Sequence, residues 1–129
     1  MTLMFVYGTL LPDQSNWYML EPWVADAGEP DTAAGAMYDT RLGWPAVVFG
    51  AGGCVRGRVF SIRRDVGDTA LAVLDEFEGI HEGAYSRIEI ATEGGRTAWA
   101  YHAGRTFPDP IPGGDWAAHV NGRHGRHGR

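Results

Sequence analysis

Only one segment of this sequence has the apolar spacing of a long amphipathic helix, and this constrains the fold more than any other feature. The spacing predicts a helix over Asp65–Glu78, with Asp65 as its N-cap and Gly79 at the position that follows the last helical residue. The residues that repeat at helical intervals and share one face are Val66, Ala70, Val73, Leu74 and Phe77.

Short apolar segments rich in aromatic and β-branched residues lie on both sides of this helix and predict strands. The predicted strands are Leu3–Tyr7, Ala46–Phe49, Cys54–Ile62, Tyr85–Ala91 and Thr97–His102. Glycine turns over Gly50–Gly53 and Glu93–Arg96 connect neighbouring strands, and Gly57 indicates a bulge or a close backbone approach. Because strands outnumber helices and do not alternate with them, we expect an α+β domain with a twisted sheet, open or closed.

The two ends of the sequence give weaker signals. Asp13 or Ser15 is a candidate cap for a short helix that Pro22 ends, and Trp116 and Val120 are candidate late anchors of the core. The length of 129 residues fits one domain, which we place over residues 1–120. Residues 121–129 repeat Arg, His and Gly, a composition that predicts a disordered tail.

Composition excludes several classes of enzyme. The chain has no lysine, so a Schiff-base enzyme, a pyridoxal-phosphate enzyme anchored by lysine and a Walker P-loop are all ruled out. A single cysteine, Cys54, allows neither an intramolecular disulfide nor a cysteine-based zinc site. Residues 123–129 contain three arginines and no acid, which leaves −8 of charge on the remainder of a chain whose net charge is −5. An acidic body argues against a nucleic-acid partner.

No segment has the pattern of a signal peptide or the roughly 20 apolar residues that a membrane span needs, so we expect a cytoplasmic protein that does not contact membranes. The three serines and Cys54 lack the sequence settings of activated nucleophiles, and we expect structural roles for them. The Glu-x-x-His of Glu78–His81 occurs only once, so neither a metal site nor a cofactor is predicted.

Glu78 is the candidate for proton transfer. Of the acidic residues at the helix end, Asp75 and Glu76 fall opposite the apolar face, whereas Glu78 lies at its rim and alone among the helix carboxylates should be partly buried. Burial, neighbouring carboxylates and the negative end of the helix would each raise its pKa. A glutamate tuned toward neutrality suits general acid–base catalysis, and the alternative interpretation is a solvated acidic helix end.

The turn Tyr7–Leu10 is the second candidate. A buried strand that ends in an aromatic residue and a glycine exposes backbone N–H groups, which can bind an anion or a carboxylate. The alternative interpretation is an ordinary junction between a strand and a loop.

Two motifs, which follow one another along the chain, give this sequence its resemblance to a known family. Phe-Val-Tyr-Gly-Thr-Leu occupies residues 5–10, and Leu-Asp-Glu-Phe-Glu-Gly at residues 74–79 precedes Tyr85-Ser86-Arg87. Between them, Trp44–Val48 and Val55–Phe60 appear in the expected order. Over residues 3–102 the chain resembles the γ-glutamylcyclotransferase-like superfamily. Its Tyr-Gly-Thr-Leu form is most similar to the γ-glutamylamine cyclotransferase branch.

The resemblance implies a mixed, twisted β-barrel flanked by a few helices and a cofactor-independent transferase reaction. In that reaction, the α-amino group of a small-molecule γ-glutamyl amine or amide attacks its own γ-carbonyl, which gives 5-oxoproline and a free amine. By resemblance, Glu78 is the general acid/base, and Tyr7, Gly8, Thr9 and Leu10 form the substrate-binding loop beside Tyr85. Residues 20–35 and 50–53 depart from the family pattern and are candidates for the leaving-group side.

Two other functions remain open from the sequence. The first is a non-catalytic small-molecule binding domain that retains the same pocket. The second is a nucleic-acid binder that uses its arginine-containing tail. The acidic charge of the rest of the chain disfavours this interpretation.

Overall fold

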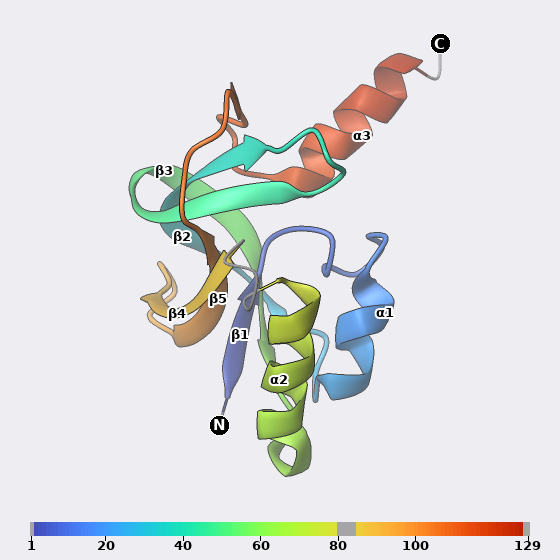
Figure 1. Cartoon of the computed structure of the whole chain (residues 1–129), viewed down its shortest axis with the longest axis vertical. Coiled ribbons are helices and arrows are strands. Elements are labelled where there is room, and N and C mark those ends of the chain that lie inside the picture. Colours follow the sequence, from blue (N-terminus) through green and yellow to red (C-terminus); the bar gives the residue numbers. More distant parts are fainter. Residues whose placement is uncertain (1, 80–84, 128–129) are drawn as a thin grey trace.

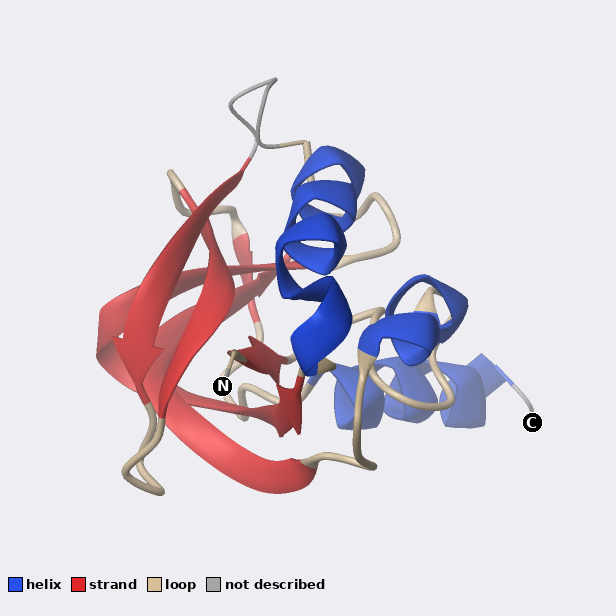
Figure 2. Cartoon of the chain, turned by 90° about the horizontal axis from the view of Figure 1, so that it is seen from below, coloured by secondary structure: helices blue, strands red, loops and turns tan. Residues whose placement is uncertain are grey.

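The computed structural model describes residues 2–79 and 85–127, which form one curved sheet with helices beside it (Figure 1). The strands are β1 Leu3–Val6, β2 Glu29–Asp39, β3 Pro45–Ser61, β4 Tyr85–Ala91, β5 Thr97–Ala103 and β6 Asp109–Pro110. The α-helices are α1 Trp17–Leu20, α2 Gly67–Phe77 and α3 Trp116–His127, and short 3₁₀ turns occupy η1 Glu21–Trp23 and η2 Arg64–Val66. Figure 2 shows the strands curving around a common interior with helices to one side, so the predicted α+β class and barrel-like sheet are confirmed.

β1 lies inside a sheet whose strand order is β4-β5-β1-β3-β2-β6. It pairs antiparallel with β3 and parallel with β5. Phe5 points into one cluster of buried residues, whereas Met4 and Val6 belong to a second cluster that includes Ala70 and Leu74 of α2. Both faces of β1 are therefore covered, which explains why the segment is a continuous apolar run and does not alternate with polar residues.

β3 differs from the prediction of two strands separated by a turn. Its pairing with β2 runs from Glu29↔Val59 to Ala34↔Cys54 and resumes at Gly35↔Phe49, so residues 50–53 bulge out of one continuous strand. Gly50, Gly52 and Gly53 in this bulge have positive φ angles of 122°, 106° and 150°, which favour glycine. The close approach predicted at Gly57 is confirmed, because a Cβ there would collide with the Val6 carbonyl.

α2 begins at Gly67, two residues later than predicted. Asp65 is not its N-cap: it lies in η2 and pairs with Arg63 at 3.1 Å, while the N-cap position is held by Val66 without a side-chain hydrogen bond. The end of α2 follows the prediction. Gly79 has a φ of +76° and donates its N–H to the Glu76 carbonyl at 3.1 Å, which closes the helix as glycine commonly does.

The predictions for the other elements are confirmed in part. The short helix α1 forms, but Asn16 takes its N-cap position, so neither Asp13 nor Ser15 caps it. Pro22 lies in η1 directly after α1. The predicted hairpin is present as β4 and β5, which pair from Tyr85↔Ala103 to Ala91↔Thr97.

The sequence did not predict the C-terminal helix α3. Trp116 is buried and Val120 packs against the same cluster, so both predicted anchors are confirmed. α3 then continues to His127 through residues for which we predicted disorder. The anchored first turns supply the nucleus that helix formation needs, and each further residue adds to an existing helix. No helix among the described residues is both long enough and apolar enough to cross a membrane.

Candidate functional site

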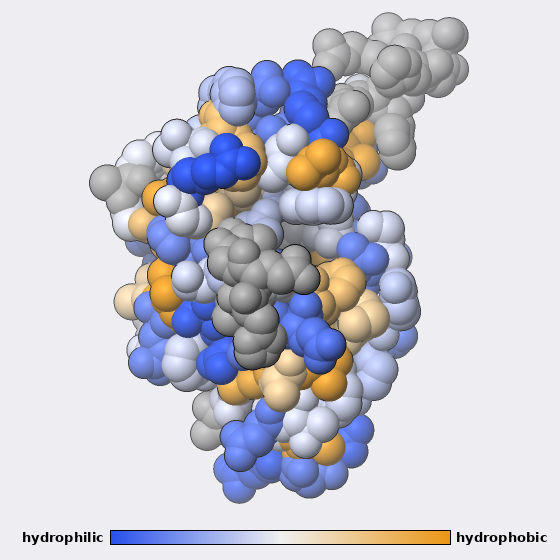
Figure 3. Space-filling model, in the orientation of Figure 1, coloured by the Kyte–Doolittle hydropathy of each residue, from blue (hydrophilic) through white to orange (hydrophobic). Residues whose placement is uncertain are grey.

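A cavity of about 390 Å³ opens where β1 ends and α2 ends. It is lined by the backbone turn after β1 and by side chains that include Trp44, Phe77, Glu78, Tyr85 and Tyr101. In Figure 3 the surface is recessed on this side of the molecule, between the strands above and helices α1 and α2 below. Its volume falls within the range of about 300–1,000 Å³ that is usual for small-molecule sites.

The turn Tyr7–Leu10 is held from several sides. The Tyr7 hydroxyl donates to the Tyr101 carbonyl at 2.7 Å, and Asn16 donates its amide side chain to the Thr9 hydroxyl at 3.0 Å. The Gly8 carbonyl accepts from the N–H of Leu11 at 3.1 Å. A Cβ on Gly8 would lie 2.8 Å from Pro45, so only glycine fits here without a shift of its neighbour.

The amides of this turn are available to a ligand. Among the described residues, the N–H groups of Thr9 and Leu10 have no backbone acceptor, whereas the carbonyls of Gly8 and Thr9 accept from the N–H groups of Leu11 and Asn16. Thr9 and Leu10 line the cavity, and backbone N–H groups at a turn can bind anions or carboxylates.

Glu78 follows the last residue of α2, and its N–H donates to the Leu74 carbonyl at 2.9 Å. The side chain is partly buried and lines the cavity, and burial raises its pKa from an ordinary 4.5 to about 7. The cause is loss of contact with water, one of the three effects that we expected. At neutral pH the carboxyl group therefore exists in both protonation states.

Tyrosines surround Glu78. Burial, and then the negative charge of Glu78, raise the pKa of Tyr85 to about 12 and also raise the pKa of Tyr7. Both phenols remain protonated at neutral pH and act as hydrogen-bond donors. Tyr85 donates its hydroxyl to the Pro45 carbonyl at 3.3 Å. The structure thus brings all the candidate residues of the sequence, from Tyr7 to Leu10 with Glu78 and Tyr85, to one cavity.

Asp75 does not lie where the sequence predicted, and it belongs to a polar cluster that the sequence did not reveal. We expected it on the solvent side, yet its side chain is only 18% exposed. Arg87 holds it through bonds of 2.7 and 3.1 Å, and the Tyr101 hydroxyl donates to it at 2.9 Å. Arg87 also stacks on Trp99, 4.4 Å from the ring centroid. This cluster ties the end of α2 to β4 and β5, directly beside Glu78.

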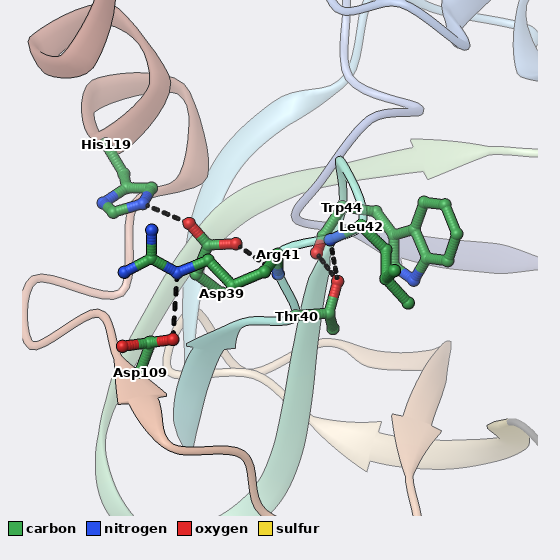
Figure 4. A network of polar contacts seen from close by, with 7 residues as sticks. All are labelled: Asp39, Thr40, Arg41, Leu42, Trp44, Asp109 and His119. Atoms are coloured by element: carbon green, nitrogen blue, oxygen red, sulfur yellow. Dashed lines mark hydrogen bonds and ion pairs between the residues drawn. The ribbon is translucent and has the colours of Figure 1, made fainter.

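A second network braces the wall that carries Trp44 (Figure 4). The buried carboxylate of Asp39 accepts from the Arg41 N–H at 2.8 Å and contacts the His119 ring of α3 at 2.9 Å. Arg41 pairs with Asp109 at 2.9 Å. The Thr40 hydroxyl donates to the Trp44 carbonyl at 2.7 Å, which closes the turn. The sequence gave no sign of this network.

Several other candidates are not among the described residues that line the cavity. Cys54 is exposed, and no group of histidine, cysteine or carboxylate side chains among the described residues could hold a metal ion. His81 of the Glu-x-x-His pattern lies outside the described residues. Residues 20–35 and 50–53, considered for the leaving-group side, contribute nothing to the described lining of the cavity.

Comparison with known proteins agrees with this geometry. The family described as gamma-glutamyl cyclotransferase, AIG2-like, matches residues 4–118. No curated protein shows significant similarity to the chain.

Solved structures share the fold. An uncharacterised protein from Pyrococcus horikoshii is 20% identical with a TM-score of 0.72, and each chain is covered fully. YkqA from Bacillus subtilis is 25% identical with a TM-score of 0.73, although the match covers 95% of this chain and 42% of YkqA. An AIG2-like protein from Mus musculus is 22% identical with a TM-score of 0.56, covering 84% of this chain and 80% of the mouse chain. With most of its length matched by the family and its fold shared with these structures, the chain belongs to the gamma-glutamyl cyclotransferase, AIG2-like family.

Proposed function

We propose that this protein is a γ-glutamyl cyclotransferase that converts a γ-glutamyl amine or amide to 5-oxoproline and a free amine. The substrate supplies its own nucleophile, the α-amino group. This agrees with a cavity whose described lining offers no activated serine or cysteine. Family membership supports the general reaction, and the γ-glutamylamine type of substrate is the specific proposal.

One observation carries the proposal: the partly buried Glu78 lines the same cavity as Thr9 and Leu10, whose N–H groups have no backbone acceptor among the described residues. The amides are suited to a carboxylate or carbonyl oxygen of the glutamyl group, since backbone N–H groups at a turn bind such oxygens. Glu78 supplies a group whose pKa of about 7 allows it to accept and to return a proton near neutral pH.

The steps balance without a cofactor. The Glu78 carboxylate takes a proton from the α-ammonium group of the substrate. The freed amine attacks the γ-carbonyl carbon, which forms the new C–N bond of the five-membered ring. The bond between this carbon and the leaving nitrogen then breaks as Glu78 returns the proton to that nitrogen. The second proton released by the α-nitrogen also ends on the leaving group, which departs as an ammonium ion.

Positioning supplies a further part of the rate. The amine and carbonyl belong to one molecule, and the cavity has to hold them in a ring-closing conformation. Asp75, Arg87 and Tyr101 fix the end of α2 relative to the sheet, and therefore fix the distance between Glu78 and the turn after β1. We assign them a positioning role.

The test is the release of 5-oxoproline from a panel of γ-glutamyl amines. We expect turnover of at least one member and a loss of about 100-fold or more in kcat for Glu78→Gln, since general acid–base groups typically contribute at least that much. Glu76→Gln is the matched control, because Glu76 is an exposed carboxylate two residues away.

Two results would contradict the proposal. The first is undiminished 5-oxoproline release by Glu78→Gln. The second is the absence of product from every member of the panel. If γ-glutamyl amines then bind to the protein without being cyclised, the non-catalytic binding domain becomes the better description.

A further inference from the structure

Two large apolar side chains stand at the open end of the cavity. Trp44 is 42% exposed and Phe77 is 38% exposed, whereas Tyr7, Leu10 and Tyr101 on the inner lining are at most 7% exposed. Trp44 comes from the turn between β2 and β3, and Phe77 is the last residue of α2. Exposed aromatic side chains that share a cavity are typical of binding surfaces, because leaving them in water is unfavourable.

The direction in which a substrate would lie follows from the proposed function, on which this inference rests. The glutamyl group has to reach both Glu78 and the amides of Thr9 and Leu10, and these three residues are less exposed than Trp44 and Phe77. The leaving amine has to depart into solvent, so its substituent extends toward the open end. There it meets Trp44 and Phe77.

The wall that carries Trp44 is held in place before any ligand binds. Its turn is closed by Thr40 and fixed through Asp39 to His119 of α3, as Figure 4 shows. The next residue, Pro45, accepts a hydrogen bond from Tyr85 and lies against Gly8. A surface that is already ordered loses little conformational entropy when a ligand covers it.

The charge of the cavity disfavours an acidic leaving group. Among its described lining residues, Glu78 is the only carboxylic acid, and no arginine or histidine is present. Arg105 affects the pKa of Tyr85 from nearby, but its guanidinium stacks 4.2 Å from the ring centroid of Phe107. A carboxylate on the leaving amine would therefore lose water without gaining a cation in the described lining.

We propose that Trp44 and Phe77 form an apolar subsite for the substituent of the leaving amine. The preferred substrates are γ-glutamyl amides of aromatic or branched alkyl amines, and γ-glutamyl amino acids are disfavoured. Trp44 is the main specificity-determining residue of this subsite.

The experiment compares kcat/KM for γ-glutamyl-benzylamide, γ-glutamyl-methylamide and γ-glutamylglycine. We expect the benzylamide to exceed the other two substrates by roughly 10-fold or more, the usual effect of burying an aromatic group. Trp44→Ala should reduce the ratio of benzylamide to methylamide by a similar factor. Phe77→Ala, on a different element, should reduce the same ratio, so the inference does not depend on one variant.

Leu42→Ala is the matched control. Leu42 lies in the same turn and is 66% exposed, but it does not line the cavity. The ratio should be unchanged in this variant. A ratio that stays constant in Trp44→Ala and Phe77→Ala, or a preference for γ-glutamylglycine, would overturn the inference while leaving the cyclisation itself intact.

A binding measurement separates this inference from the proposed reaction. Glutaryl-benzylamide and glutaryl-methylamide lack the α-amino group and cannot cyclise, so their affinities for the Glu78→Gln protein report the subsite alone. We expect the benzylamide to bind about 10-fold more tightly, with the difference lost in Trp44→Ala. Equal affinities, or no binding by either compound, would overturn the subsite whatever the outcome of the turnover assay.

Discussion

Replacing Glu78 by glutamine should make the protein more stable, and increasingly so as the pH rises. The pKa of Glu78 is about 7 in the folded protein against an ordinary 4.5, so the folded state binds a proton more tightly than the unfolded state between these values. The stability that this proton contributes is complete below about pH 4.5 and is lost as the pH rises through about 7. At about 1.4 kcal/mol per pH unit, the ionised carboxylate lowers the free energy of unfolding by up to about 3 kcal/mol above pH 7. Partial exposure of Glu78 makes this an upper bound.

The assay is urea unfolding followed by tryptophan fluorescence at about pH 4 and about pH 8.5. Glutamine has the shape of protonated glutamate, so Glu78→Gln should match the original protein at the lower pH and exceed it by about 2–3 kcal/mol at the higher pH. Glu76→Gln, at an exposed position, should show no such pH-dependent gain. A Glu78→Gln difference that is independent of pH, or that changes sign, would refute the burial of the carboxyl group.

Other predictions test the site and the domain boundary. If Glu78 is the base, kcat/KM should rise with pH up to about 7 and then level off, and the limb should vanish in Glu78→Gln. Asp75→Asn should lower the free energy of unfolding by about 1–3 kcal/mol, because it leaves the half-buried Arg87 with a weaker partner. Asp65→Asn, in an exposed ion pair, should change the free energy of unfolding by less than about 0.5 kcal/mol. Denaturant unfolding decides this comparison, and equal effects would contradict it. A chain ending at residue 120 should retain its thermal unfolding midpoint within a few degrees, as measured by circular dichroism, and loss of the folded state would place the domain boundary beyond that residue.

Local features of the fold were predictable from the sequence. β1 is a continuous apolar run because both of its faces are buried. The residue that ends α2 is a glycine because its φ angle is positive. Each of these patterns can be recognised within a few consecutive residues of the sequence. Continuity of β3 was not predictable. The glycines over residues 50–53 resemble a turn, and only pairing with β2 on both sides shows them to be a bulge.

The candidate site was also predictable only in part. Glu78 and the turn Tyr7–Leu10 were identified because each belongs to a short motif with local physical meaning. Asp75 was misplaced because its partners, Arg87 and Tyr101, lie 12 and 26 residues further along the chain. Helical periodicity assigns a face relative to apolar neighbours on the same helix, and it contains no information about a cation supplied by another strand.

The position of β1 in the sheet has a consequence for how the chain folds while it is being synthesised. β1 finds its two neighbours only when β3 and then β5, at residues 97–103, have also been synthesised. Such distant pairings have a high contact order, which slows folding because long loops must close before the contacts form. The turn after β1 therefore gains its place beside Tyr101 only after β5 has been synthesised, and until then the apolar β1 lacks one of its two neighbouring strands.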